Sequence, residues 1–117
     1  MNAIAENYIA TWNERDPQRR ADLLSKHWAP DCLYVDPLAV GEGREGMSGT
    51  IEAVHGQFPD FAFTLLGDAD AHHRQLRFQW GLGPVGAEPV VVGFDVVVVD
   101  DDDRIADVRG FLDKVPA

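Results

Sequence analysis

The sequence predicts an α+β domain in which three helices cover one face of a curved antiparallel sheet. Two helical patterns come first, a third follows one short strand, and four strand patterns in a row complete the chain. Helices that precede a meander of strands favour this class over alternating βα units. The expected order is α-α-β-α-β-β-β-β. A chain of 117 residues suffices for one core, so residues 1–117 are expected to form a single domain.

The first two helices are predicted from apolar spacing and from a capping signal. Apolar residues recur at helical spacing across residues 2–14, so one stripe of this helix faces the core. Asp16 followed by Pro17 has the pattern of an N-cap and a proline at the first helical position. The second helix is expected to continue to Ala29, because Pro30 ends it.

A short strand, a glycine-rich loop and the third helix come next. Residues 32–35 are apolar and favour a strand, and Pro37 holds Asp36 outside the helical region at its end. Residues 39–43 are expected to form the loop. Apolar residues on one face of residues 44–58 predict the third helix, whose three glycines leave it dependent on tertiary packing.

Four strands are predicted in the remainder of the chain, over residues 61–65, 76–82, 90–99 and 105–112. The third of them is apolar on both faces apart from Asp95. One face can pack on the helices, so the other needs a second cover. We therefore expect a homodimer through the outer face of the sheet.

The composition and charge exclude several kinds of partner. A net charge of −10 repels phosphate backbones and anionic lipids, so neither nucleic acid nor a membrane is an expected partner. The N-terminus lacks the basic and apolar regions of a secretory signal, and a cytoplasmic location is expected. Cys32 is expected in the core. Neither His72-His73 nor the acidic residues 100–103 have recognised ligand spacing, so no metal is expected.

Two carboxylates have a structural and a functional interpretation. An ionised Asp95 in an apolar strand is costly unless it is paired. It is either the partner of a nearby donor or a neutral acid that donates a hydrogen bond into a cavity. Asp36 is either a turn residue after a strand or an acid fixed where an apolar layer ends.

Four short motifs follow one another over essentially the whole chain: Asn7-Tyr8-Ile9, Tyr34-Val35-Asp36-Pro37, Gly43-Arg44-Glu45, and Asp95 followed by valines, acids and Arg104-Ile105. Their joint order resembles the ketosteroid isomerases and the wider NTF2-like, SnoaL-like group. The resemblance implies a cone-shaped α+β barrel, in which a curved sheet wraps around one long helix and an apolar pocket opens at the wide end. It also implies frequent dimers.

The resemblance further implies roles for three residues. Asp36 matches the general base of the isomerases, Tyr8 the oxyanion-hole tyrosine, and Asp95 the protonated oxyanion-hole aspartate. A carboxylate in an apolar pocket removes a proton beside a carbonyl while two donors stabilise the enolate oxygen, and no cofactor is needed. The sequence departs from some isomerases at the position of a tyrosine that supports the oxyanion hole, where it has Ile51.

Further residues are candidate pocket walls, with core packing as the alternative interpretation: Trp12, Phe61, Phe63, Phe78, Trp80, Val108 and Leu112. Trp12 is also an alternative donor to Tyr8. His55 is an alternative base or a surface histidine on the third helix. Asp107 and Arg109 are expected to form a surface pair.

Two functions fit these observations. One is a cofactor-independent isomerase or polyketide cyclase that acts on a small apolar carbonyl compound, steroid-like or polyketide-like, with Asp36 as the base. The other is a non-catalytic protein that binds an apolar ligand, or a dimeric module with a vestigial cavity. The fold alone cannot separate them, because one architecture serves many functions.

Overall fold

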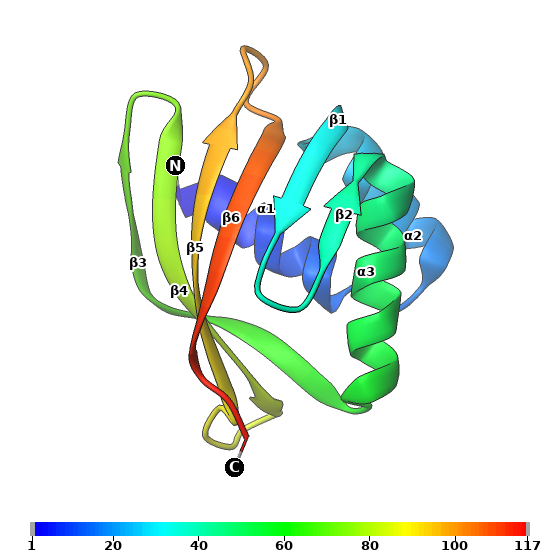
Figure 1. Ribbon diagram of the computed structural model, residues 1–117, viewed down its shortest axis with the longest axis vertical. Coiled ribbons are helices and arrows are strands. Elements are labelled where there is room, and N and C mark those ends of the chain that lie inside the picture. Colours follow the sequence, from blue (N-terminus) through cyan, green and yellow to red (C-terminus); the bar gives the residue numbers. More distant parts are fainter. Residues whose placement is uncertain (1, 117) are drawn as a thin grey trace.

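A computed structural model describes residues 2–116 and contains three helices and one six-stranded sheet (Figure 1). The elements are α1 (Asn2–Asn13), α2 (Pro17–His27), β1 (Trp28–Val35), β2 (Val40–Glu42), α3 (Gly43–Gln57), β3 (Phe61–His72), β4 (Gln75–Pro84), β5 (Val91–Val99) and β6 (Ile105–Lys114). The strand order is β2-β1-β6-β5-β4-β3. The predicted α+β fold is confirmed, and the sheet curves without closing, with β2 and β3 at its edges.

Two features of the sheet differ from the prediction. Residues 40–42, which were expected in a loop, form β2 and pair with β1 in antiparallel register. The chain folds back there because the Asp36 N–H donates to the Ala39 carbonyl at 3.0 Å. β1 also pairs with β6 in parallel, so the sheet is mixed. After β1 and β2 the chain crosses through α3 to the far edge, and the meander returns to β1 only with β6.

The start of α2 confirms the predicted cap, and its end lies two residues earlier than expected. The Asp16 carboxylate accepts from the Arg19 N–H at 2.9 Å, and Pro17 occupies the first turn. The helix ends at His27 because Trp28 adopts an extended conformation and joins the sheet opposite Ile105. None of the helices within residues 2–116 is both long and apolar enough to cross a membrane.

Aromatic rings of α1 pack on the concave face of the sheet. The ring of Tyr8 stacks on Trp28 at 5.6 Å and meets the edge of Phe78 at 5.0 Å, and the ring of Trp12 lies 5.0 Å from Phe63. Figure 1 shows α1 behind the sheet and α3 beside β2. His55 of α3 donates to the Trp12 carbonyl at 2.6 Å and so fixes α3 to the end of α1. These contacts form one core and set the floor of the cavity described below.

The two faces of β5 differ in burial. The inner face carries buried residues, namely Val91, Gly93, Asp95, Val97 and Val99, and the outer face carries the partly buried or exposed residues Val92, Phe94, Val96 and Val98. Next to this outer row, Phe111 of β6 lies opposite Phe94 and is 59% exposed. The outer face is therefore apolar at its centre and open to solvent in the single chain.

Side chains at and beside α1 hydrogen-bond the free edge of β3. The Asn13 amide accepts from the Phe63 N–H at 2.7 Å and donates to the Phe63 carbonyl at 2.9 Å. Arg15 donates to the Phe61 carbonyl at 2.9 Å, and Asn2 accepts from the Ala69 N–H at 3.3 Å. This edge strand is thus paired with β4 on one side and with side chains on the other.

Candidate functional site

A cavity of about 410 Å³ lies between the concave face of the sheet, α1 and the end of α3. Most of its lining is apolar or aromatic: Tyr8, Trp12, Tyr34, Asp36, Leu38, Val54, Gln57, Phe58, Phe63, Trp80, Val91, Leu112, Val115 and Pro116. Leu38 is 81% exposed although it is apolar, and it lines this cavity. An apolar cavity of this size with a few polar groups is typical of a small-molecule site.

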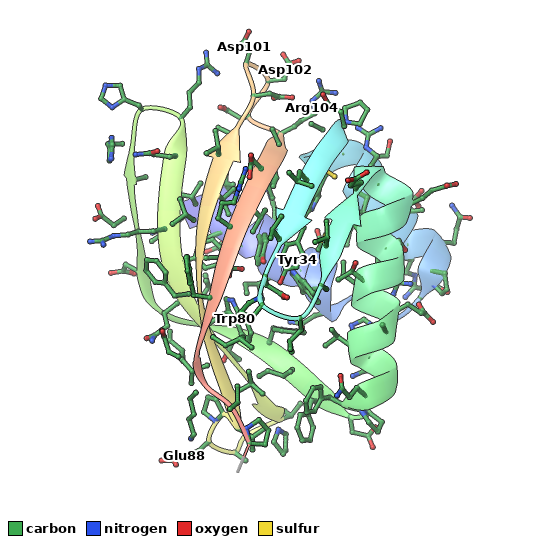
Figure 2. All side chains as sticks on the ribbon, in the orientation of Figure 1. Tyr34, Trp80, Glu88, Asp101, Asp102 and Arg104 are labelled. Atoms are coloured by element: carbon green, nitrogen blue, oxygen red, sulfur yellow. The ribbon has the colours of Figure 1, made fainter. Side chains whose placement is uncertain are left out.

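The structure brings most of the predicted site residues together. The residues that line the cavity as predicted are Tyr8, Trp12, Asp36, Phe63, Trp80 and Leu112. Asp95 is not among the lining residues; it is buried and accepts a hydrogen bond from the Tyr8 hydroxyl. Tyr34 and Trp80, labelled in Figure 2, come from strands on opposite sides of β6 and β5 and both contribute to the lining.

Three predicted walls are not part of the lining. Phe78 is covered by the edge contact of Tyr8, and Val108 is fully buried in the core. Phe61 stacks on Phe58 at 5.4 Å, and Phe58 is the member of this pair that faces the cavity. The corrections at Phe61 and Phe78 arise because a neighbouring aromatic ring covers each of them, which strand alternation alone does not reveal.

Asp36 is held by the turn that follows β1. Its Oδ1 accepts from the backbone N–H groups of Leu38 and Ala39 at 2.7 and 2.8 Å, and its Oδ2 accepts from the Tyr34 hydroxyl at 2.5 Å. Each carboxylate oxygen has two acceptor positions, so Oδ1 is fully occupied and Oδ2 can accept one further hydrogen bond. The carboxylate is therefore fixed in orientation on the wall of the cavity.

Tyr34 is a site residue that the sequence analysis did not assign. It lies two positions before Asp36, and side chains two apart on a strand share a face, so its position relative to Asp36 was available as a signal. Burial raises the pKa of Tyr34 well above 10, and the charges of Asp95 and Asp36 raise it further. Tyr34 thus stays protonated and supplies a hydroxyl that the fully buried Ile51 cannot.

The end of α3 adds residues that were also missed, namely Val54, Gln57 and Phe58. The helical stripe predicted there was assigned only to the core. His55, the alternative base, is not among the lining residues and instead bonds the Trp12 carbonyl. Burial lowers the pKa of His55, although its bond to that carbonyl opposes the shift.

Asp95 and Tyr8 form a buried pair beneath the cavity. Asp95 is 1% exposed, and the Tyr8 hydroxyl donates to its Oδ2. Burial raises the pKa of Asp95 to about 6; the Tyr8 and Trp80 side chains oppose this rise, and the charge of Asp36 adds to it. Burial, followed by the charge of Asp95, raises the pKa of Tyr8 well above 10. In the free protein the neutral Asp95 that the resemblance implies is thus the main form only below about pH 6.

Gly110 allows the two carboxylates to approach each other. It lies opposite Asp95 in the β5–β6 register. A Cβ atom at Gly110 would lie 2.7 Å from Oδ1 of Asp95 and 3.3 Å from Cβ of Asp36. The site therefore requires a residue without a side chain between its two acids.

Replacing Gly110 by alanine is expected to lower the free energy of unfolding by about 1–3 kcal/mol, the usual effect of overpacking. The new methyl group would push the Asp95 carboxyl away from Tyr8. Urea unfolding at pH 7 measures the effect. The matched control is Gly49→Ala on α3, where a Cβ meets nothing within 4 Å and alanine should instead stabilise the helix by up to about 1 kcal/mol. Equal stability of Gly110→Ala and the wild type would contradict this packing.

The other polar candidates lie away from the cavity. Arg109 donates to Asp107 at 2.8 Å on β6, as the surface pair that was predicted. The turn between β5 and β6 carries Asp101 and Asp102, which Figure 2 shows at the end of the sheet opposite the C-terminus. Within residues 2–116, no group of three or more His, Cys, Asp or Glu side chains is arranged to hold a metal ion.

Comparison with known proteins gives one family and several similar structures. The family model described as a SnoaL-like domain matches residues 5–108. A crystal structure from Agrobacterium tumefaciens, assigned as an isomerase of the SnoaL-like family, is 43% identical over 95% of both chains, with a TM-score of 0.90. No curated protein matches the sequence.

Two further crystal structures share the fold at low identity. One, assigned as a polyketide cyclase from Sinorhizobium meliloti, is 17% identical over 94% of both chains, with a TM-score of 0.72. The other, assigned as a ketosteroid isomerase from Kribbella flavida, is 19% identical over 99% of this chain and 79% of its own, also with a TM-score of 0.72. At such identities the likeness shows the fold alone.

Proposed function

Since this chain belongs to the SnoaL-like family, we propose that it binds a small apolar carbonyl compound and moves a proton at the carbon beside the carbonyl. The observation that supports the proposal most directly is the placement of Asp36. Its carboxylate is fixed by two backbone N–H groups and a tyrosine hydroxyl on the wall of a largely apolar cavity. A positioned carboxylate in such surroundings is suited to act as a general base.

In the proposed reaction Asp36 removes a proton from the carbon next to the carbonyl. The electron pair of that C–H bond moves toward the carbonyl oxygen, which becomes an enolate. Hydrogen-bond donors at the Tyr8–Asp95 end of the cavity stabilise the new charge, and the low polarity of the walls strengthens that interaction. Asp36 then returns the proton to a different carbon, so a double bond shifts and no atom is gained or lost.

The same first step serves a cyclase. There the enolate carbon attacks the carbon of a second carbonyl of the same molecule, and the π electrons of that carbonyl move to its oxygen. This oxygen takes the proton held by Asp36, so a ring that bears a hydroxyl group forms. A steroid-like or polyketide-like compound is the proposed substrate class, because the cavity has mostly apolar walls and a volume of about 410 Å³.

The test is to incubate the protein with a β,γ-unsaturated ketone and to follow the conjugated product by its absorbance. We expect turnover in the wild type and much slower turnover in Asp36→Asn. The same rate in both proteins would reject Asp36 as the base.

A second candidate, ligand binding without catalysis, is favoured by one observation. The Tyr8 hydroxyl and the Asp36 carboxylate already have internal partners, since Tyr8 donates to Asp95 and both oxygens of Asp36 accept hydrogen bonds. Titration of the tryptophan fluorescence with apolar ketones distinguishes the candidates. Saturable quenching without any Asp36-dependent conversion would favour the binding protein.

We also propose that two copies associate through the outer face of the sheet, where Phe111 and Phe94 are neighbours. Light scattering at micromolar concentration should give about twice the chain mass of 12.9 kDa. Phe111→Asp should shift the protein toward the single-chain mass, because it places a charge in the patch that the proposed dimer would bury. Val85→Asp is the matched control, since Val85 is exposed in the turn after β4. A wild type of single-chain mass would contradict the proposal.

A further inference from the structure

Three buried polar atoms have no hydrogen-bond partner within the described residues 2–116, two of them on residues that line the cavity. They are Nε1 of Trp12, Nε1 of Trp80 and Oδ1 of Asp95, and we call them the open polar atoms. A buried donor left without an acceptor costs about 1–3 kcal/mol. Trp12 and Trp80 are lining residues of the cavity, but neighbouring atoms cover both Nε1 atoms in this structure, so a bound molecule can supply the acceptors only if the rings turn toward it.

The indole of Trp80 is held over β5 by a close contact with Gly93. A Cβ atom at Gly93 would lie 2.1 Å from the indole ring, so only glycine leaves room for it. Asp95 follows two positions later on the same inner face of β5. The Trp80 side chain lowers the pKa of Asp95, and neither Nε1 of Trp80 nor Oδ1 of Asp95 has a hydrogen-bond partner within residues 2–116.

The indole of Trp12 faces the other member of the buried pair. Its N–H acts on the Tyr8 hydroxyl and lowers the pKa of that group, against the larger rise caused by burial. Between the two indoles lies Phe63, whose ring is 5.0 Å from Trp12 and 5.3 Å from Trp80. The two N–H groups therefore flank the Tyr8–Asp95 pair, one on each partner.

Trp28 shows what a purely structural indole does in this core. Its Nε1 donates to Oγ1 of Thr11 at 3.2 Å, and its ring stacks on Tyr8. The three tryptophans of the chain thus include one with an internal acceptor and two, Trp12 and Trp80, whose donors are open polar atoms.

We propose that the indole N–H groups of Trp12 and Trp80 are the donors that bind the oxygen of the ligand. The Tyr8 hydroxyl is not free for this task, because its proton is directed at Asp95. The inference rests on the proposed function, since it assigns the donors that meet the carbonyl oxygen. It also defines the ligand class, which is an apolar skeleton with an acceptor oxygen at the end that meets the two indoles.

Indole N–H resonances of the ¹⁵N-labelled wild type test the proposal without any substitution. The probes are 1-tetralone and tetralin, which share a skeleton and differ in the carbonyl oxygen; 1-tetralone has no double bond for the protein to shift. With 1-tetralone we expect the Trp12 and Trp80 resonances to move downfield, while Trp28 is the internal control. Equal movements with tetralin, or no movement at a saturating concentration of 1-tetralone, would overturn the proposal.

Affinities of the Trp80→Phe and Trp12→Phe proteins give a second readout. Each substitution removes the N–H and keeps an aromatic ring. The affinity for 1-tetralone relative to tetralin should fall by roughly 5–10-fold in each variant, as expected for one hydrogen bond. Taking the ratio of the two ligands cancels effects of altered packing. An unchanged ratio in both variants would overturn the proposal.

The Asp36→Asn protein separates this inference from the proposed function. It should bind 1-tetralone with the same indole shifts, because asparagine leaves both tryptophans in place. Indole shifts without Asp36-dependent turnover would support the inference and reject the catalytic role of Asp36. Turnover that depends on Asp36 but is unaffected by either Trp→Phe substitution would support the catalytic role of Asp36 and overturn the inference about the indoles.

Discussion

Replacing Asp36 by asparagine is expected to lower kcat for conjugation of a β,γ-unsaturated ketone by roughly 10²–10⁴-fold, the usual contribution of a positioned general base. The loss should fall on the chemical step. The asparagine oxygen can still accept from the N–H groups of Leu38 and Ala39, so the turn after β1 is preserved. KM should therefore change much less than kcat.

The matched control is Asp68→Asn, the same chemical change at an exposed residue of β3. Absorbance of the conjugated ketone gives kcat and KM for all three proteins. A large rise in KM with an unchanged kcat would mean that Asp36 binds the ligand and does not move a proton.

Replacing Asp95 by asparagine is expected to raise the free energy of unfolding by up to about 3 kcal/mol at pH 7–8, which is the energy equivalent of a pKa shift from 3.8 to about 6. Burial is the main cause of that shift, so the ionised form is disfavoured in the folded chain. The stability linked to Asp95 is fully present below pH 4. It is lost as the pH rises from about 4 through about 6. Asparagine carries no charge, and its oxygen can still accept from Tyr8.

Urea unfolding of both proteins at several pH values between 4 and 8 measures this effect. The two free energies should differ least near pH 4 and diverge as the pH rises through about 6, with Asp68→Asn following the wild type. A difference that stays constant over the whole range would show that the Asp95 carboxyl does not change its pKa on folding.

The fold was predictable because its signals are local. Helical spacing in residues 2–14, the cap at Asp16 and Pro17, and the alternation of the later strands each depend on neighbours in sequence. The short strand β2 and the parallel pairing of β1 with β6 depend on where the chain returns, so no local pattern predicts them. Trp28 shows that local patterns also misplace helix ends. The helical pattern of α2 continues into Trp28, but this residue is extended and forms part of the sheet.

The candidate acids could be named from the sequence, whereas the arrangement of the cavity walls could not. Tyr8, Asp36 and Asp95 are brought together, but their proximity depends on the register that sets Gly110 beside Asp95. Phe78 was misassigned because Tyr8 covers it. Ring stacking and strand register are properties of the assembled structure, and a linear pattern does not contain them.

The hydrogen bonds from Asn13 and Arg15 to β3 have a consequence for assembly. An exposed edge strand offers its backbone groups to any other extended chain, which is a common route to aggregation. Here both backbone groups of Phe63 and the carbonyl of Phe61 are already engaged by side chains. A strand from another molecule would have to displace them first. The sheet is thus protected against growth at this edge by residues next to those that α1 supplies to the cavity, since Asn13 directly follows Trp12.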